Sequence, residues 1–232
     1  MIALLSNDDG YDSPGLRVLR EVLIERDIHV CTAAPLQNHS GFGSARTLNR
    51  PIEVLKIMPE GTCVLDGTPC DCVAWGLQRL AKPDIVCTGL NWGDNAGQYA
   101  ISCSATIAAA RVAAIAGIPA IAFSQYLGRH RAFDPNCQQV KVLLHEAMDA
   151  LPVRPERGVV MNVNLPDPYG KHLGVKVAEI SARGGYRGKF HRVRERVWEW
   201  GQKRNKGRPK FDAELLTRGY TTVSRLPNPS GL

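Results

Sequence analysis

Two adjacent carboxylates, Asp8 and Asp9, directly follow a short apolar segment at residues 2–5. Like charges at close range raise each other's pKa unless a cation neutralises them, and a divalent metal ion can do so. The alternative is that one aspartate caps the helix expected to begin near Ser13 while the other faces water. The pair alone favours neither interpretation, so the other loops must decide between a metal site and a helix cap.

Two further loops place oxygen donors after expected strands. Residues 38–44 offer the hydroxyl of Ser40 among small residues, although this composition is also typical of an ordinary turn. Residues 88–97 alternate glycine and asparagine and place the amide of Asn91 just beyond a strand. Carboxylate, hydroxyl and amide oxygens are the donors that hard cations such as Mg²⁺ and Mn²⁺ accept.

A possible phosphate site follows a few residues later. Ser104 and Thr106 stand at the expected start of a helix, where two hydroxyls and free backbone N–H groups suit an anion. The alternative is a turn followed by a capped helix.

The elements that must position these residues follow a repeating pattern of strand, turn and helix. Apolar segments predict strands at residues 2–5, 28–34, 84–88, 120–124 and 159–164. Helical spacing predicts helices from about residue 13 and at residues 70–80, 104–116 and 138–151. This alternation predicts an α/β fold with a Rossmann-like, mainly parallel sheet flanked by helices. Ligands bind such sheets at the carboxyl ends of the strands, where the polar loops at residues 6–10, 35–44 and 88–97 fall.

The pattern changes beyond about residue 125. Residues 175–180, 190–200 and 220–226 read as antiparallel ribbon segments joined by Gly- and Arg-rich turns. We therefore expect one domain over residues 1–232. Its Rossmann-like core at 1–125 would carry the site, and residues 126–232 would add the remaining core elements and projecting hairpins that serve oligomerisation.

Composition supports an ordinary globular protein. The chain has 232 residues, of which 44% are hydrophobic and 22% charged, and this excludes collagen-like and wholly disordered classes. The most apolar stretch, residues 105–123, is interrupted by Arg111, Gly117 and Pro119, so we expect no membrane segment. No secretory signal is recognisable at the start, which predicts a cytoplasmic protein. Seven scattered cysteines predict buried thiols rather than a disulfide framework or a zinc site.

The positive charge of the chain is concentrated in one segment. Residues 183–210 hold eleven Lys and Arg against two Glu, so this segment carries +9 in a chain whose net charge is +7. Such a segment suits an anionic partner, whether a nucleotide, polyphosphate or nucleic acid. Charge alone favours the plainer interpretation, a solvated arm.

Several separated motifs resemble those of the SurE survival-protein nucleotidases. They are Leu-Ser-Asn-Asp-Asp-Gly at residues 5–10 with Pro-Gly at 14–15, the segment 34–41, Gly-Thr-Pro-Cys-Asp-Cys-Val at 67–73, the Asn/Gly loop at 89–97, Asn-Val-Asn-Leu-Pro at 162–166 and, more loosely, 219–223. They occur in the family's order and span nearly the whole chain. The resemblance implies a Rossmann-like core with a C-terminal part that exchanges hairpins or tails between subunits.

The resemblance also implies a set of site residues. Asp8, Asp9, Ser40 and Asn91 would hold one divalent metal ion per subunit, Mg²⁺ or Mn²⁺. For the reaction we expect Asp8 and Asp9 to be the catalytic residues, with Asp8 the better candidate to orient or deprotonate the attacking water. We expect Asn95, Ser104 and Thr106 to hold the phosphate. The expected reaction is hydrolysis of nucleoside 5′- and 3′-monophosphates, with short polyphosphate as a further substrate. The expected assembly is a homo-oligomer, a dimer or a tetramer.

The chain departs from the family pattern in several places. Ala105 replaces a glycine in the Ser-Gly-Thr before the long helix, Arg111 stands where an acidic residue is usual, and residues 224–227 differ from the usual terminal motif. These changes bear on phosphate affinity, substrate range and assembly and leave the metal donors intact.

Three alternatives remain beside the metal-dependent hydrolase. A haloacid-dehalogenase-like route with an Asp nucleophile needs a second Asp two residues after Asp8, where Gly10 stands. A nucleic-acid-binding module on residues 183–210 would need neither Asp8 nor Asn91. A nucleotide sensor that binds with metal but without turnover would use the same residues as the enzyme.

Overall fold

The computed structural model describes residues 1–80, 82–128, 138–152, 155–182, 186–194, 197–204 and 210–227, and within 186–191 and 197–204 it describes the backbone alone. The described chain forms a nine-stranded sheet in the order β3-β4-β2-β1-β5-β6-β7-β11-β8 and a separate two-stranded sheet. The strands of the large sheet are β1 (Ile2–Ser6), β2 (His29–Pro35), β3 (Val54–Ile57), β4 (Thr62–Leu65), β5 (Ile85–Trp92), β6 (Ala120–Gln125), β7 (Val159–Leu165), β8 (Val175–Val177) and β11 (Thr221–Pro227).

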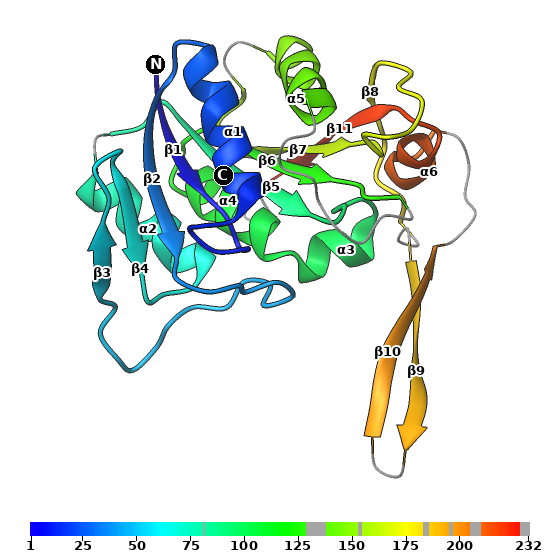
Figure 1. Cartoon of the computed structure of the whole chain (residues 1–232), viewed down its shortest axis with the longest axis horizontal. Coiled ribbons are helices and arrows are strands. Elements are labelled where there is room, and N and C mark those ends of the chain that lie inside the picture. Colours follow the sequence, from blue (N-terminus) through cyan, green and yellow to red (C-terminus); the bar gives the residue numbers. More distant parts are fainter. Residues whose placement is uncertain are drawn as a thin grey trace.

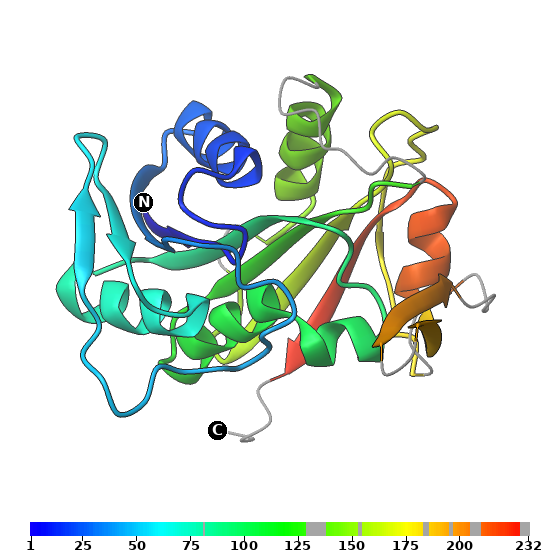
Figure 2. The same ribbon diagram turned by 60° about the horizontal axis from the view of Figure 1, so that its bottom comes forward.

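Helices cover both faces of the sheet (Figures 1 and 2). The helices are α1 (Pro14–Glu25), α2 (Pro69–Arg79), α3 (Gln98–Cys103), α4 (Ala105–Ile115), α5 (Gln138–Asp149) and α6 (Asp212–Thr217). One core cluster packs α1 and α5 on one face, and a second packs α2 and α4 on the other. Six neighbouring pairs in the sheet run parallel and two, β3 with β4 and β7 with β11, run antiparallel. The predicted α/β class, a mainly parallel sheet flanked by helices, is confirmed.

Local sequence explains where the main helices begin. The hydroxyl of Ser13 accepts a hydrogen bond from the Leu16 amide at the start of α1, and Pro14 occupies the first turn. The Ser104 hydroxyl does the same for the amide of Ile107 at the start of α4. These caps place both helix N-termini at the carboxyl edge of the sheet, beside the loops that follow β1 and β5.

Two C-terminal segments join the main sheet, although we expected antiparallel ribbons there. β11 pairs antiparallel with β7, and β8 pairs parallel with β11. Thr221, Thr222 and Val223 are buried in the structure. β11 is therefore an inner strand of the main sheet, with β7 on one side and β8 on the other, and is not part of a solvent-exposed ribbon. The expected ribbon near residues 190–200 is present. β9 (Tyr186–Arg194) and β10 (Val197–Arg204) pair antiparallel and project from the body (Figure 1).

Two further observations bear on the class of protein. Within the described ranges, no helix combines the length and apolarity that crossing a membrane requires. The six cysteines that the structure describes are free thiols. Burial raises the pKa of the Cys70 thiol to about 11. This thiol therefore stays protonated near neutral pH.

Candidate active site

Three loops meet at the carboxyl edge of the sheet, as the strand pattern predicts. β1 lies between β2 and β5, with Ser6 in register with Thr88, so the loops after these strands are neighbours. The amide of His39 donates to the Asp8 carbonyl at 2.7 Å, which joins the second loop directly to the first. Asn7 closes the first loop, donating from Nδ2 to the Gly10 carbonyl at 2.8 Å.

Asp8 is the most enclosed of the predicted ligands. It is 3% exposed, and its Oδ1 accepts a 2.6 Å hydrogen bond from the hydroxyl of Thr106 on α4. Burial raises the pKa of this carboxyl, and the Thr106 bond and the charge of His39 offset the rise only in part. The negative charge of Asp8 is therefore unfavourable in the protein without a cation.

Asp9 shares this unfavourable environment. Its oxygens accept hydrogen bonds from the Trp92 amide and from Asn38 Nδ2, both at 3.3 Å, and from the Ser40 side chain. Burial, followed by the charge of Asp8, raises the pKa of Asp9 to about 6, while these hydrogen bonds oppose the rise. Two adjacent carboxylates whose pKa values are both raised are what a bound cation would stabilise.

The other two predicted ligands lie at the same place. The amide of Ser40 donates to Asn38 Oδ1 at 2.7 Å, a tight turn that holds the Ser40 hydroxyl against Asp9. Asn91 is 8% exposed, and its Nδ2 donates to the Gly93 carbonyl at 2.7 Å. Because its nitrogen is engaged in this way, the amide oxygen of Asn91 is the atom left to bind a cation. The structure thus brings two carboxylates, a hydroxyl and an amide together.

A cavity of about 330 Å³ opens beside these donors. Its walls include five predicted site residues: Asp8, Ser40, Asn91, Asn95 and Ser104. Thr106 is fully buried behind Asp8 and does not line the cavity. Asp9 is also outside the cavity wall, although it contacts Ser40 and the backbone of Trp92.

Asn95 is held by polar side chains that sequence reasoning did not select. Its amide N–H donates to Asn164 Oδ1 at 2.8 Å, its carbonyl accepts from Asn162 Nδ2 at 2.9 Å, and its own Nδ2 donates to the hydroxyl of Ser124 at 2.8 Å. On the same loop the amide of Gly97 donates to the buried Asp212 at 2.7 Å. The sequence could have pointed to Asn162 and Asn164, because asparagines within an otherwise apolar strand are expected to be buried and to need hydrogen-bond partners.

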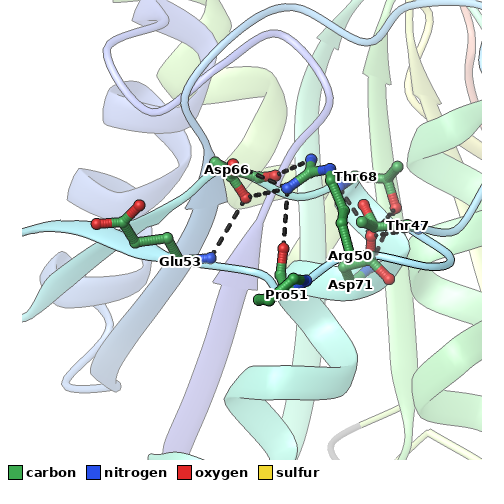
Figure 3. Close-up of polar contacts among 7 residues, drawn as sticks. All are labelled: Thr47, Arg50, Pro51, Glu53, Asp66, Thr68 and Asp71. Atoms are coloured by element: carbon green, nitrogen blue, oxygen red, sulfur yellow. Dashed lines mark hydrogen bonds and ion pairs between the residues drawn. The ribbon is translucent and has the colours of Figure 1, made fainter.

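The loop that carries Ser40 is anchored at its far end by two carboxylates (Figure 3). Asp71, in the first turn of α2, accepts hydrogen bonds from Arg46 Nε and the Thr47 amide, both at 2.8 Å, and forms a capping box with Thr68. Further along, Asp66 binds Arg50 at 2.8 Å. The motif at residues 67–73 therefore has a structural role: it fastens the chain that leaves the site.

Comparison with known proteins gives a consistent result. The family model described as Survival protein SurE matches residues 3–186. A protein named 5'/3'-nucleotidase SurE from Photorhabdus laumondii is 34% identical, over 96% of this chain and 88% of its own length. A protein named 5'-nucleotidase SurE from Aquifex aeolicus is 38% identical, over 78% of this chain and 71% of its own. The crystal structure of the Aquifex aeolicus SurE protein superposes with a TM-score of 0.79 at 30% identity, covering 98% of this chain and 93% of that one.

Proposed function

The chain belongs to the SurE family, and from that premise we propose that it is a divalent-metal-dependent phosphomonoesterase that hydrolyses nucleoside 5′- and 3′-monophosphates. The observation that carries the proposal is the pair of adjacent carboxylates, Asp8 and Asp9, held with raised pKa values at the edge of a cavity. Holding two such charges together without a cation is unfavourable. A site for a metal ion and an anionic ester explains why they are there.

The donor set fits a hard divalent ion. Asp8, Asp9, Ser40 and Asn91 would hold one Mg²⁺ or Mn²⁺ per subunit, because carboxylate, hydroxyl and amide oxygens suit these ions. When bound, such an ion supplies Lewis-acid chemistry, polarising phosphoryl oxygens and offsetting negative charge. The hydrogen bonds of Thr106 to Asp8 and of Trp92 to Asp9 fix the direction in which the two carboxylates point.

The other residues of the site divide the remaining work. Asp8 orients or deprotonates the attacking water, and Thr106, whose hydroxyl donates to Asp8, acts as a positioning residue. Ser104 accepts from the Ile107 amide and keeps its own O–H to donate to a phosphate oxygen. One N–H of the Asn95 amide group donates to Ser124, which leaves the second for phosphate.

Finer parts of the proposal concern partners and setting. Short polyphosphate is a further substrate, the protein acts as a homodimer or homotetramer, and it works in the cytoplasm. A nucleic-acid-binding module on residues 183–210 is not favoured, because it leaves the converging oxygen donors without a role. A nucleotide sensor without turnover uses the same donors, so an activity assay must separate the two.

The test is phosphate release from nucleoside 5′- and 3′-monophosphates, short polyphosphate and p-nitrophenyl phosphate, with EDTA, Mg²⁺ or Mn²⁺. We expect activity to vanish in EDTA and to return when either metal is added. Full activity in the chelator would contradict metal dependence. Metal-dependent binding of nucleotide without phosphate release would instead identify a sensor.

A further inference from the structure

One short segment of the chain, residues 96–103, lies between the two residues that we assign to the phosphate. The Asn/Gly loop that carries Asn95 leads into α3, and α3 leads directly to Ser104 at the start of α4. Upstream of the segment, the Gly93 amide donates to the Gln125 carbonyl at 3.0 Å and fixes the loop to β6. The places of both phosphate contacts therefore depend on what holds residues 96–103.

A buried carboxylate holds the start of this segment. Asp212 is the first residue of α6 and is fully buried, and its Oδ2 accepts a 2.7 Å hydrogen bond from the Gly97 amide. Its Oδ1 accepts from the amide of Ser181 at 3.0 Å and from that of Ala213 at 2.8 Å. Burial raises the pKa of this carboxyl, and the three hydrogen bonds oppose the rise. Both oxygens of Asp212 are thus engaged by backbone N–H groups, one of which belongs to the Asn/Gly loop.

These hydrogen bonds belong to a junction between the segment and the base of the projecting hairpin. We define the base as residues 178–181 and 211–213, which flank β9 and β10 in the chain. The Gln98 amide donates to the Ser181 carbonyl at 3.0 Å, and Ala96 packs, fully buried, against α6. The hairpin leaves the body beside α3 and α6 (Figures 1 and 2). A C-terminal part of the chain therefore holds the segment that connects the phosphate contacts.

We propose that Asp212 is a positioning residue of the active site, which fixes residues 96–103 against the base of the hairpin and so sets the places of Asn95 and Ser104. The inference rests on the proposed function and adds to it a residue that acts through the backbone of another element. Its contact with Gly97 joins residues 115 positions apart in the sequence.

The proposal predicts that Asp212 affects the ester and not the metal. Asn91 lies upstream of the Gly93 contact, and the other metal donors belong to different loops. A catalytic or binding group displaced by about 1 Å can cost about 100-fold in rate. Loss of the bond to Gly97 should therefore change KM and kcat for phosphate esters while the metal requirement stays near that of the parent.

The test uses Asp212→Asn in the full chain. Asparagine has the same shape, but its NH₂ group faces backbone N–H donors, so at least one of the three hydrogen bonds is lost. We expect kcat/KM for p-nitrophenyl phosphate to fall roughly 10- to 100-fold, and the Mn²⁺ concentration for half-maximal activity to stay close to that of the parent. Leu216→Ala loosens the packing of α6 on Ala96, so it should give the same pattern more weakly, and it replaces Asp212→Asn if that variant does not fold.

Ser224→Ala is the matched control. It removes a buried 3.0 Å hydrogen bond from the Ser224 hydroxyl to the Ala178 carbonyl, in the same C-terminal part of the chain, without a contact to the Asn/Gly loop. This variant should keep the kinetic constants of the parent. Thermal unfolding confirms that each variant is folded at the assay temperature, and hydrogen exchange at residues 93–103 should be faster in Asp212→Asn than in Ser224→Ala.

The outcomes separate this inference from the proposed function. Kinetic constants of Asp212→Asn equal to those of Ser224→Ala would overturn the inference and leave the hydrolase standing, and so would equal exchange at residues 93–103. Absence of phosphate release by the parent would contradict the hydrolase. Binding of AMP with Mn²⁺ would then replace the kinetics: weaker binding to Asp212→Asn than to Ser224→Ala would support the positioning role, and equal binding would overturn it.

Discussion

At the scale of single residues, burial of the adjacent carboxylates Asp8 and Asp9 is unfavourable for the protein without metal. The pKa of Asp9 in the folded protein without metal is about 6, above its ordinary value of 3.8. A carboxyl whose pKa is raised by folding stabilises the fold while it is protonated. That stabilisation is complete below about pH 4 and is lost as the pH rises through about 6. At neutral pH the charged Asp9 should therefore make the metal-free protein less stable than a protein with a neutral side chain at this position.

We expect Asp8→Asn and Asp9→Asn each to reduce kcat more than about 1,000-fold, because metal coordination contributes several kcal/mol to the transition state. In EDTA at pH 7, Asp9→Asn should be more stable than the parent by roughly 1–2 kcal/mol, after allowing for screening by solvent. Steady-state kinetics and thermal unfolding measure the two effects. Asp12→Asn, an exposed carboxylate on the same loop, is the control. If either aspartate variant kept a nearly normal kcat, the substituted residue would not belong to the active site.

The sequence was informative about the predicted metal ligands and less informative about the residues that hold these ligands in place. Asp8 lies just after β1, and Asn91 lies within the last two residues of β5, which extends past the end expected from the sequence at residue 88. Parallel-sheet topology brings these strand ends together, and both residues line the same cavity. Thr106 was expected at the phosphate, and its hydroxyl instead donates to Asp8. That contact depends on how α4 packs against β5 and β6, a long-range arrangement that no local pattern reveals.

At the scale of elements, the start of α2 anchors the loop that carries Ser40. Burial favours a neutral Asp71, but the hydrogen bonds from Thr47, Thr68 and Arg46 outweigh it, so the pKa of this carboxyl is lowered. Its stabilising effect is therefore present above about pH 4 and is lost as the pH falls through its lower folded value. The charge on this carboxylate holds the loop, and the loop positions the Ser40 hydroxyl.

We expect Asp71→Asn to lower the free energy of unfolding by about 2–3 kcal/mol, because it weakens several charge-assisted hydrogen bonds in a buried place. The Mn²⁺ concentration that gives half-maximal activity should rise about 10-fold, as it does when outer partners of metal ligands are lost. Denaturant unfolding and metal titration test both. The parent should lose more stability than this variant between pH 5 and pH 3.

A control on the same loop is Arg50→Ala, which breaks the half-exposed ion pair with Asp66. Such pairs contribute about 0–1 kcal/mol, so its stability should change little and its metal requirement should stay that of the parent. If Asp71→Asn required no more metal than Arg50→Ala, the anchor at α2 would have no part in positioning Ser40.

At the same scale, sequence analysis did not predict how strands pair when the partners are far apart in the sequence. Strand character was evident near residues 175–180 and 220–226, but their partners were not. β11 lies between β7 and β8 because Thr221, Thr222 and Val223 are buried there, and threonines in a short run are equally compatible with an exposed ribbon. The strands β3 and β4 were also missed, because each has only four residues; β3 is mostly exposed and β4 is buried.

At the scale of the molecule, the basic segment at residues 183–210 contains the projecting hairpin. β9 and β10 contact each other far more than the body, and Arg192, Val193 and Arg194 are exposed in the chain as described. The residues at positions 190, 198 and 200 are aromatic, and their side chains are not among those that the structure describes. An isolated two-stranded hairpin is marginally stable in water, so a partner is the expected source of its stability.

We predict that a second subunit binds this hairpin. Deletion of residues 187–206 should release a smaller species in light scattering, with thermal unfolding confirming that the nine-stranded body remains folded. The double variant Arg192→Glu/Arg194→Glu keeps the hairpin and changes only its charge. A deletion variant with the mass of the parent assembly would show that the hairpin does not join subunits.

The charge of the hairpin makes a separate prediction about rate. If the positive segment overhangs the active site of a neighbouring subunit, it should speed capture of anionic substrates, and raising the salt concentration should remove this benefit because screening acts over about 10 Å at 0.1 M. Polyphosphate, with many charges, should respond more than p-nitrophenyl phosphate. We therefore expect Arg192→Glu/Arg194→Glu to lower kcat/KM for polyphosphate at low salt and to flatten its salt dependence.

Arg79→Glu/Lys82→Glu makes the same charge change at exposed positions near the end of α2 and is the control. Equal salt profiles in the two double variants would show that the basic segment is only a solvated arm.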